Sequence, residues 1–401
     1  MKSWLGATLA RRPMWMNVLL IFCIYMTFVF MPRDMFVKPV RVDEEAWFGL
    51  LLRGWAAKLT EPIHWAIYAA GMYGFWRMRR WMWPWAALYT AQVAIGMLVW
   101  SVVYVGGFRG WAGGLLGFMP IAALAVALWR ARDAFGRRRG SLRQRYGEWA
   151  LVTGASAGIG AEFARALARD GLSCVLVARR EDRLKLLAEE LERHHRVATR
   201  VVAIDLTQPG ASNALADRVA DLEIGLLVNN AGFGGSGRFD KVATTRLEEM
   251  VQLNCLVPVA VTRRLLPAMV TRRRGAVIIV GSVAGRQPLP LHSVYSATKA
   301  FDMLFGEALW AELQGSGVDA LVLEPGATAT EFQAVAGEVA HAGEPPQSVV
   351  EAALDALGHQ PSVVSGWGNW LGANAIRLAP RSIAALMAKQ VVAPWTPAEM
   401  R

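Results

Sequence analysis

The sequence has little cysteine, and its first third has little acid. Three of the 401 residues are cysteine, Cys23, Cys174 and Cys255, and their spacing matches no metal-binding motif. Three scattered cysteines argue against a disulfide framework and fit a reducing compartment. Residues 1–147 contain six Asp or Glu against 19 Lys or Arg, whereas the rest of the chain contains 26 against 24. The excess of positive charge therefore belongs to the first third.

The first third also contains long runs without any charged residue. Three of these runs reach the length of a membrane-spanning helix, about 20 residues. A fourth run, residues 62–76, reaches that length only if it extends back to residue 55, with Lys58 and Glu61 turned toward the interface. An interfacial helix is the alternative for this segment. The sequence thus predicts a membrane region over residues 1–147, with spans at 14–32, 55–76, 81–107 and 110–129.

Short arginine clusters between these runs predict the topology. With four spans, the N-terminus, the turn at 77–80 and the basic segment at 130–145 fall on one side of the membrane, and the nearly neutral loop at 33–61 falls on the other. Positive charge marks the cytoplasmic face, so we expect the region after residue 147 to be cytoplasmic. Basic clusters are also typical of nucleic-acid binding, but their placement between apolar runs favours a bilayer, and we expect no nucleic-acid partner.

From residue 148 onward, short apolar runs alternate with amphipathic stretches. The runs ALVTG, SCVLVAR, RVVAIDL, IGLLVNNAG, AVIIVGS and DALVLEPG are predicted to be buried strands, and helical patterns separate them, as at 159–170, 181–195 and 293–314. This alternation predicts an α/β fold, a Rossmann-type doubly wound parallel sheet with helices on both faces. We expect this domain at 148–340 and a C-terminal helical extension at 341–401.

Glycines follow the first predicted strand. Gly154, Gly158 and Gly160 stand at a strand-to-helix turn, where the backbone can approach a pyrophosphate and the helix N-terminus supplies amide donors. A glycine cluster alone is a weak signal, and an ordinary tight turn is the alternative. The second strand ends in Arg179-Arg180, where an arginine pairs with a 2′-phosphate, so NADPH is favoured over NADH. A pair of solvated arginines is the alternative there.

Polar residues also follow the later strands. Asp205 ends the third strand, where a carboxylate can accept from an adenine amino group, and an NNAG motif ends the fourth. Ser282 follows the fifth strand, where its hydroxyl can donate to a substrate carbonyl. Tyr295 and Lys299 are four apart on one face of a predicted helix. A lysine ammonium beside a phenol is expected to lower the phenol pKa toward neutrality, which suits proton transfer.

Taken in order, TGASAGIG, ARR, DL, NNAG, Asn254, Ser282, YSATK and PGATAT resemble the short-chain dehydrogenase/reductase family over about residues 148–335. The resemblance implies a nicotinamide-dependent oxidoreductase with Tyr295 as acid/base, Lys299 as pKa modulator and ribose ligand, Ser282 as substrate orienter and Asn254 as holder of a relay water. Thr328 departs from the family's usual valine or isoleucine. No metal is expected. The implied cofactor contacts are Gly154, Ser156, Gly158, Ile159, Gly160, Arg179, Asp205, Leu206, Asn230, Ala231, Gly232, Tyr295, Lys299, Pro325, Gly326 and Thr330.

The substrate and the role of the C-terminal segment are less sharply indicated. Residues 362–392 are amphipathic and resemble an extension found in one broad bacterial subgroup of the family, so a bacterial inner membrane is the expected location. A packed helix, a homodimer contact and docking on a membrane all remain open for this segment. The membrane anchor and the apolar loop at 288–291 favour a lipophilic carbonyl or alcohol substrate. The alternative function is an NADPH-binding membrane sensor or scaffold with little turnover.

Overall fold

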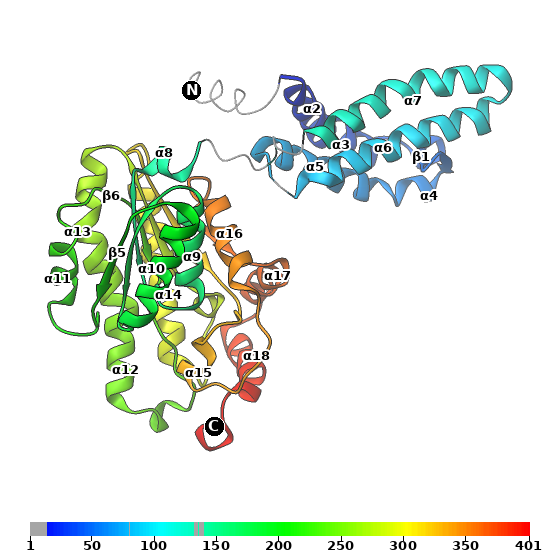
Figure 1. The fold of residues 1–401 in the computed structure, drawn as a ribbon. Coiled ribbons are helices and arrows are strands. Elements are labelled where there is room, and N and C mark those ends of the chain that lie inside the picture. The colour runs from blue at the N-terminus through cyan, green and yellow to red at the C-terminus, as the bar shows by residue number, and fades with distance from the viewer. Residues whose placement is uncertain (1–13, 80, 132–134, 136–139) are drawn as a thin grey trace. The chain divides into compact units, whose positions relative to one another are not determined.

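The computed structural model describes residues 14–79, 81–131, 135 and 140–401. By its internal contacts the chain divides into two compact units, Met1–Arg138 and Arg139–Arg401, and each unit has a hydrophobic core of its own. The first unit is built from helices, and the second from a sheet flanked by helices (Figure 1).

Three of the predicted spans correspond to long apolar helical segments in the first unit. The structure has segments of sufficient length and apolarity at Trp15–Phe36, Met82–Val105 and Gly107–Arg130. The first passes through a π-helical turn, which widens the helix without ending it, and the second ends in one. The elements are α2 (Met14–Tyr25), η1 (Met26–Phe30), α3 (Met31–Phe36), α6 (Met82–Trp100), η3 (Ser101–Val105) and α7 (Gly107–Arg130).

The predicted span at 55–76 is divided in the structure. It forms a short helix α4 (Trp55–Lys58) and a 17-residue helix α5 (Glu61–Arg77). The division has a local cause, because Pro62 favours the first turn of a new helix and cannot continue an existing one. Helix α5 is shorter than the three long segments. Whether α5 crosses the membrane decides between three and four crossings.

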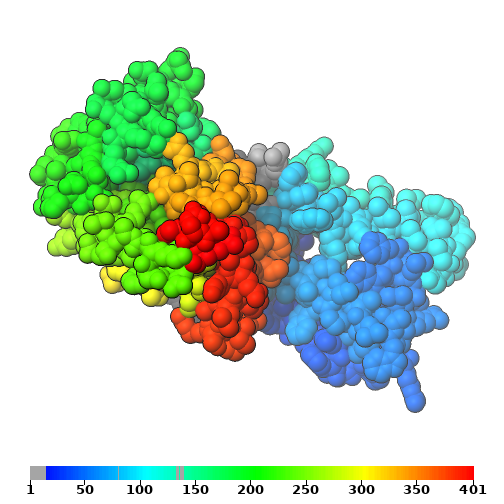
Figure 2. Space-filling view, turned by 90° about the horizontal axis from the view of Figure 1, so that it is seen from below, coloured from blue at the N-terminus to red at the C-terminus, as the bar shows by residue number. Residues whose placement is uncertain are grey.

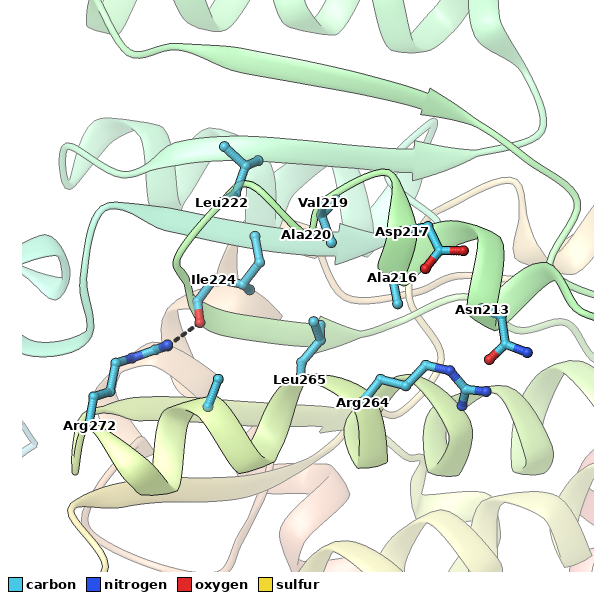
Figure 3. A pocket seen from close by; sticks show the side chains of 11 residues that line it. Asn213, Ala216, Asp217, Val219, Ala220, Leu222, Ile224, Arg264, Leu265 and Arg272 are labelled. Carbon is cyan, nitrogen blue, oxygen red and sulfur yellow. Dashed lines mark hydrogen bonds between the residues drawn. The ribbon is translucent and has the colours of Figure 1, made fainter.

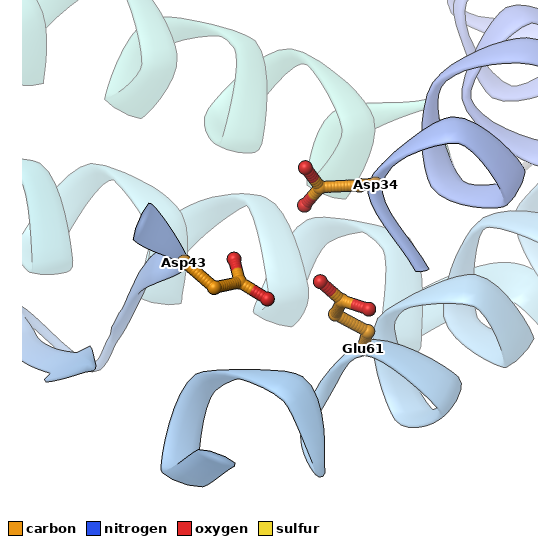
Figure 4. Close-up of side chains that lie close together, drawn as sticks. All are labelled: Asp34, Asp43 and Glu61. Atoms are coloured by element: carbon orange, nitrogen blue, oxygen red, sulfur yellow. The ribbon is translucent and has the colours of Figure 1, made fainter. Parts of the chain in front are cut away.

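A buried ion cluster lies at the start of α5 (Figure 4). Oxygen atoms of Asp34, Asp43 and Glu61 lie within 4.8 Å of one another. The Lys38 ammonium contacts Asp43 at 2.7 Å and Asp34 at 3.3 Å, and the Lys58 ammonium contacts Asp43 and Glu61 at 3.2 Å each. These two lysines supply counter-charge to the three carboxylates. The chain between Asp43 and Lys58 contains an unpredicted hairpin of β1 (Glu44–Trp47) and β2 (Leu50–Arg53).

The second unit contains a seven-stranded parallel sheet in the order β5-β4-β3-β6-β7-β8-β9. Its central strands are apolar and buried on both faces, as parallel strands between two helical layers must be. The six predicted strands are all present, and the predicted Rossmann-type fold is confirmed. The strands are β3 (Trp149–Thr153), β4 (Ser173–Ala178), β5 (Thr199–Ala203), β6 (Ile224–Asn229), β7 (Gly275–Val280), β8 (Val318–Glu324) and β9 (Ser362–Val364).

Helices cover both faces of this sheet (Figure 1). One core, which includes Phe163 and Val349, joins the sheet to α9, α10 and α16. The other, which includes Val261 and Leu309, joins it to α11, α13 and α14. The bounds are α9 (Gly158–Arg169), α10 (Glu181–His195), α11 (Ala211–Asp217), α12 (Thr244–Val251), α13 (Val257–Thr271), α14 (Ser293–Glu312), α15 (Phe332–Ala336) and α16 (Pro346–Ala356).

A fourth segment, Thr244–Thr271, is also long and apolar enough to cross a membrane. It consists of α12, the π-helical turn η6 (Gln252–Leu256) and α13. Because α13 buries Val257, Val261 and Met269 in the core beneath the sheet, this segment is a layer of the second unit.

The sheet continues beyond residue 340. Strand β9 pairs with β8 in parallel, and α16 connects the two strands. The expected boundary between 148–340 and 341–401 therefore falls inside one fold. The sequence analysis missed β9 because three residues are too few to show a strand pattern. After β9 the chain is helical, with α17 (Trp367–Ala375), the 3-10 turn η8 (Ile376–Leu378) and α18 (Arg381–Val392).

Candidate active site

A cleft of about 580 Å³ opens at the carboxyl ends of strands β3 to β8. This is the edge of a doubly wound sheet where ligands bind. Of the site residues expected from the sequence, only Gly160 and Asn254 do not line it, and both lie directly behind residues that do. A hollow of about 660 Å³ elsewhere, between α11 and α13, is lined by Asp217, Arg264 and Arg272 among others and by none of the expected site residues (Figure 3).

The glycine turn between β3 and α9 is packed tightly against the end of β6. Gly154 has a φ of +69°, and a Cβ there would lie 2.6 Å from the Asn230 side-chain nitrogen. A Cβ on Gly160 would lie 2.3 Å from the Gly154 carbonyl oxygen. The side-chain amide of Asn230 donates to the Thr153 carbonyl at 2.9 Å and fixes the two loops together. The cleft is thereby lined by Ser156, Gly158 and Ile159 at the N-terminus of α9, where amide groups and the helix dipole favour a phosphate.

The two arginines after β4 have different surroundings. Arg180 donates to the Ser156 hydroxyl at 3.1 Å and to the Glu331 carboxylate at 2.8 Å. Arg183 also pairs with Glu331. Arg179 is exposed, lines the cleft and forms no ion pair with any residue in the part of the chain that the structure describes. Arg179 is thus the cation available to a ligand at this end of the cleft.

Asp205 and Leu206 line the cleft after β5. One oxygen of the Asp205 carboxylate accepts from the Thr207 amide at 3.0 Å and from its hydroxyl at 2.8 Å. These bonds fix the orientation of a carboxylate that lines the cleft.

The structure brings Ser282, Tyr295 and Lys299 together at the opposite end of the cleft. Ser282 follows β7, and its hydroxyl accepts from the Ala284 amide at 3.1 Å. Tyr295 and Lys299 lie on α14. Burial raises the pKa of the Tyr295 phenol, and the Lys299 ammonium and a hydrogen bond with Ser282 oppose this effect without reversing it. The expected fall of this pKa toward neutrality is therefore wrong for the structure as it stands, because desolvation outweighs the lysine.

Lys299 has a partner that the sequence analysis missed. Its ammonium donates to the Val280 carbonyl at 2.8 Å and to the Asp302 carboxylate at 2.9 Å, and both charged side chains are buried. Burial lowers the pKa of Lys299, but the opposing effects, of which Asp302 and then Tyr295 are the largest, leave that pKa raised. The spacing of three residues on one helix was the available signal, since i,i+3 residues share a face.

Asn254 lies behind the cleft in the π-helical turn between α12 and α13. Its side-chain oxygen accepts from the Phe233 amide at 3.1 Å, and its nitrogen donates to the Phe233 carbonyl at 3.0 Å and to the Thr298 hydroxyl at 3.0 Å. These bonds connect the loop after β6 to the helix that carries Tyr295. Turns of this π-helical kind occur frequently at functional sites.

A second group missed by the sequence analysis borders the cleft beside Tyr295. The buried carboxylate of Glu338 contacts the His292 ring nitrogen at 3.1 Å and that of His341 at 3.0 Å. The two histidines lower the pKa of Glu338 against the effect of burial. Glu338 and His341 are three residues apart, but His292 is distant in the sequence, so local spacing does not reveal the group as a whole.

The far wall of the cleft comes from the segment after β8 and from the C-terminal helices. Pro325, Gly326 and Thr330 line it as expected, and Thr328 is beside them. A Cβ on Gly326 would lie 2.4 Å from the Asn369 side chain of α17. Among the other lining residues, Leu289 belongs to the apolar loop singled out in the sequence, while Val391, Val392 and Trp395 come from α18 and the turn after it.

Comparison with known proteins agrees with this geometry. Residues 148–339 match the family model described as short chain dehydrogenase. The very-long-chain 3-oxoacyl-CoA reductase of Macaca fascicularis is 30% identical over 284 residues, which cover 67% of this chain and 89% of that protein. The 7beta-hydroxysteroid dehydrogenase of Collinsella aerofaciens is 32% identical over 236 residues, 57% of this chain and 90% of the relative.

The fold is also that of solved structures of the family. A short-chain dehydrogenase from Sphingobium yanoikuyae in complex with NADPH superposes with a TM-score of 0.53 at 33% identity, over 58% of this chain and 94% of its own. With its parallel sheet, its cleft and these relatives, the chain belongs to the short-chain dehydrogenase/reductase family and is an oxidoreductase acting on CH–OH or C=O groups.

Proposed function

We propose that the chain is a membrane-anchored, NADPH-dependent reductase of a lipophilic carbonyl compound, able to oxidise the corresponding alcohol in reverse. The observation that carries the cofactor choice is Arg179, an exposed cation at the ribose end of the cleft with no ion pair among the described residues. A guanidinium can form paired, charge-assisted bonds with a 2′-phosphate. The residues present fit the whole dinucleotide, from Arg179 past the turn at Ser156–Ile159 to Tyr295.

The chemistry is assigned from the residues at the other end of the cleft. A bound nicotinamide would supply the hydride for reduction. The Ser282 hydroxyl would hold the substrate oxygen, and the Tyr295 phenol would donate the proton to that oxygen. The raised pKa of Tyr295 keeps the phenol protonated at neutral pH, which is the form that reduction requires.

Lys299 and Asn254 would act through Tyr295. The Lys299 ammonium favours the phenolate that remains after proton donation, because an opposite charge nearby stabilises the ionised form. The side-chain groups of Asn254 are engaged by Phe233 and Thr298. A relay water at this position would therefore be held by its main chain.

The lipophilic substrate is supported by the walls of the cleft and by the apolar helices of the first unit. Leu289, Phe332 and Val335 line the cleft, together with Val391 and Trp395. The relatives include a reductase of very-long-chain 3-oxoacyl-CoA and a dehydrogenase of hydroxysteroids, whose substrates both contain large apolar groups. An apolar wall next to a half-buried proton donor suits a ketone on a long chain or a ring system.

The proposal is tested with the full chain reconstituted in lipid nanodiscs. NADPH oxidation is followed with long-chain 3-oxoacyl thioesters, steroid ketones and small water-soluble ketones. The variant Tyr295→Phe should lose about 10²- to 10⁴-fold in turnover, the usual contribution of a general acid, and should still bind NADPH because only the transferable proton is removed.

Tyr146→Phe is the matched control, since that phenol lies outside the cleft and donates to Asp319 at 2.7 Å. Half or more of the activity surviving in Tyr295→Phe would refute the assignment. Tight NADPH binding without turnover of any carbonyl would favour a sensor or scaffold instead.

A further inference from the structure

Helix α18 has an unusual division between its two faces. It buries Ala384, Ala388 and, at its end, Val392, which are 4%, 7% and 2% exposed, and turns its other large apolar side chains outward. Leu386 and Met387 are 66% and 52% exposed. A helix at the surface of a water-soluble domain normally has the opposite arrangement, with its large apolar residues facing the core.

The preceding helix continues the same feature. Trp367 is 74% exposed and stacks on Trp370 with ring centroids 5.1 Å apart, and Leu378 in η8 is 90% exposed. The space-filling view shows the C-terminal residues, orange to red, together on one side of the second unit (Figure 2). We call the exposed apolar side chains of α17, η8 and α18 the C-terminal apolar face. Exposed apolar side chains gathered in one segment mark a site that another apolar surface covers.

The charge of residues 362–392 indicates what kind of surface covers the C-terminal apolar face. Between residues 362 and 392 there are three cations, Arg377, Arg381 and Lys389, and no Asp or Glu. All three cations are exposed. Large apolar side chains, tryptophan and basic residues without acid form the composition of a helix that lies in the headgroup region of a membrane. A second copy of this face would instead place like charges opposite one another.

A short linker joins the second unit to the apolar helices of the first. Only residues 131–141 separate the apolar helix α7 from the first helix of the second unit, α8 (Leu142–Tyr146). If α7 is anchored as proposed, docking of the C-terminal apolar face costs little translational freedom, because the unit is already held at the surface.

The same helices border the active-site cleft. Asn369 of α17 and Val391 and Val392 of α18 line the cleft that contains Tyr295. We propose that the C-terminal apolar face docks on the anionic surface of the membrane, and that lipophilic substrate passes from the lipid into the cleft alongside α17 and α18. The passage of substrate rests on the proposed function, whereas the docking does not.

The docking is tested by site-directed spin labelling of the full chain in nanodiscs of equal phosphatidylcholine and phosphatidylglycerol. A nitroxide is placed at Leu386→Cys, and at Leu186→Cys on α10 as the matched control, because both leucines are 66% exposed. The three native cysteines are buried and should not compete for the label.

The label at 386 should be accessible to oxygen and shielded from a water-soluble nickel complex, and the label at 186 should be accessible to nickel. Equal nickel accessibility at both positions would overturn the proposal. Low accessibility at 386 to both reagents would indicate a protein contact, such as a second copy, and would overturn it as well.

Substrate passage is tested by reversing the three cations together, with Arg377→Glu, Arg381→Glu and Lys389→Glu. Each basic residue near an anionic surface contributes enough attraction that kcat/KM for a membrane-resident ketone should fall by roughly tenfold or more. Turnover of a small water-soluble ketone should stay unchanged. An equal loss on both ketones would refute the passage, whereas a parent protein that reduces neither ketone would refute the proposed function and leave the labelling result standing.

Discussion

Cofactor preference offers the most direct quantitative prediction, because two adjacent arginines have different partners. Arg180 is bound to Ser156 and Glu331, while Arg179 forms no ion pair with a described residue. Replacing Arg179 with Asp removes the cation proposed for the 2′-phosphate and introduces a carboxylate that can accept from ribose hydroxyls.

The expected magnitude depends on the kind of bond that is lost. A hydrogen bond to a charged group contributes about 1.5–3 kcal/mol, which corresponds to roughly ten- to a hundredfold in affinity. Repulsion between the new carboxylate and the phosphate adds to this loss. Binding of NADPH by Arg179→Asp should therefore weaken by at least tenfold, while binding of NADH should hold steady or improve.

Nicotinamide fluorescence titration of the reconstituted protein gives both dissociation constants. The same substitution at Arg180 is the comparison, and it should change the NADPH to NADH ratio less, because Arg180 is already committed to Glu331. A parent protein that prefers NADH, or an Arg179→Asp variant with an unchanged preference, would refute the reasoning.

Three further outcomes are expected. Asp302→Asn removes a negative charge that raises the pKa of Tyr295. Because alcohol oxidation needs the phenolate, its rate should begin to rise at a lower pH in this variant. An unmoved pH–rate profile would assign Asp302 a purely structural role. Gly160→Ala forces a Cβ to within 2.3 Å of a carbonyl oxygen and should lower both the melting temperature and NADPH affinity, and calorimetry showing neither loss would contradict the tight packing of the glycine turn. A reporter fused near Asp43 should lie outside the cytoplasm and one after Arg145 inside it, whereas a shared side would show that α5 does not cross the membrane.

The sequence was most informative where chemistry depends on local spacing. Strand patterns were sufficient to predict the fold, and the positions of Gly154, Ser282 and Tyr295 were sufficient to predict which edge of the sheet carries the cleft. The partners of these residues required the structure, because Asp302 resembles an ordinary solvated helix residue until its burial is known. The contact of Glu338 with His292 joins two segments that are 46 residues apart, which no local pattern records. The net pKa of Tyr295 also depends on desolvation, a property of the packed protein rather than of the motif.

Because residues near the C-terminus form one wall of the cleft, the cleft is completed late in synthesis. Tyr295 and Lys299 leave the ribosome before Asn369, and Trp395 emerges later still, yet all four line one cleft. The cleft residues that are synthesised last are also held by main-chain hydrogen bonds, such as that from the Val339 amide to the Trp395 carbonyl at 2.7 Å. Because domains form as they are translated, the nascent chain exposes its catalytic tyrosine well before it has a complete pocket. Reducing activity should therefore begin only when the segment around Trp395 has been released and folded back.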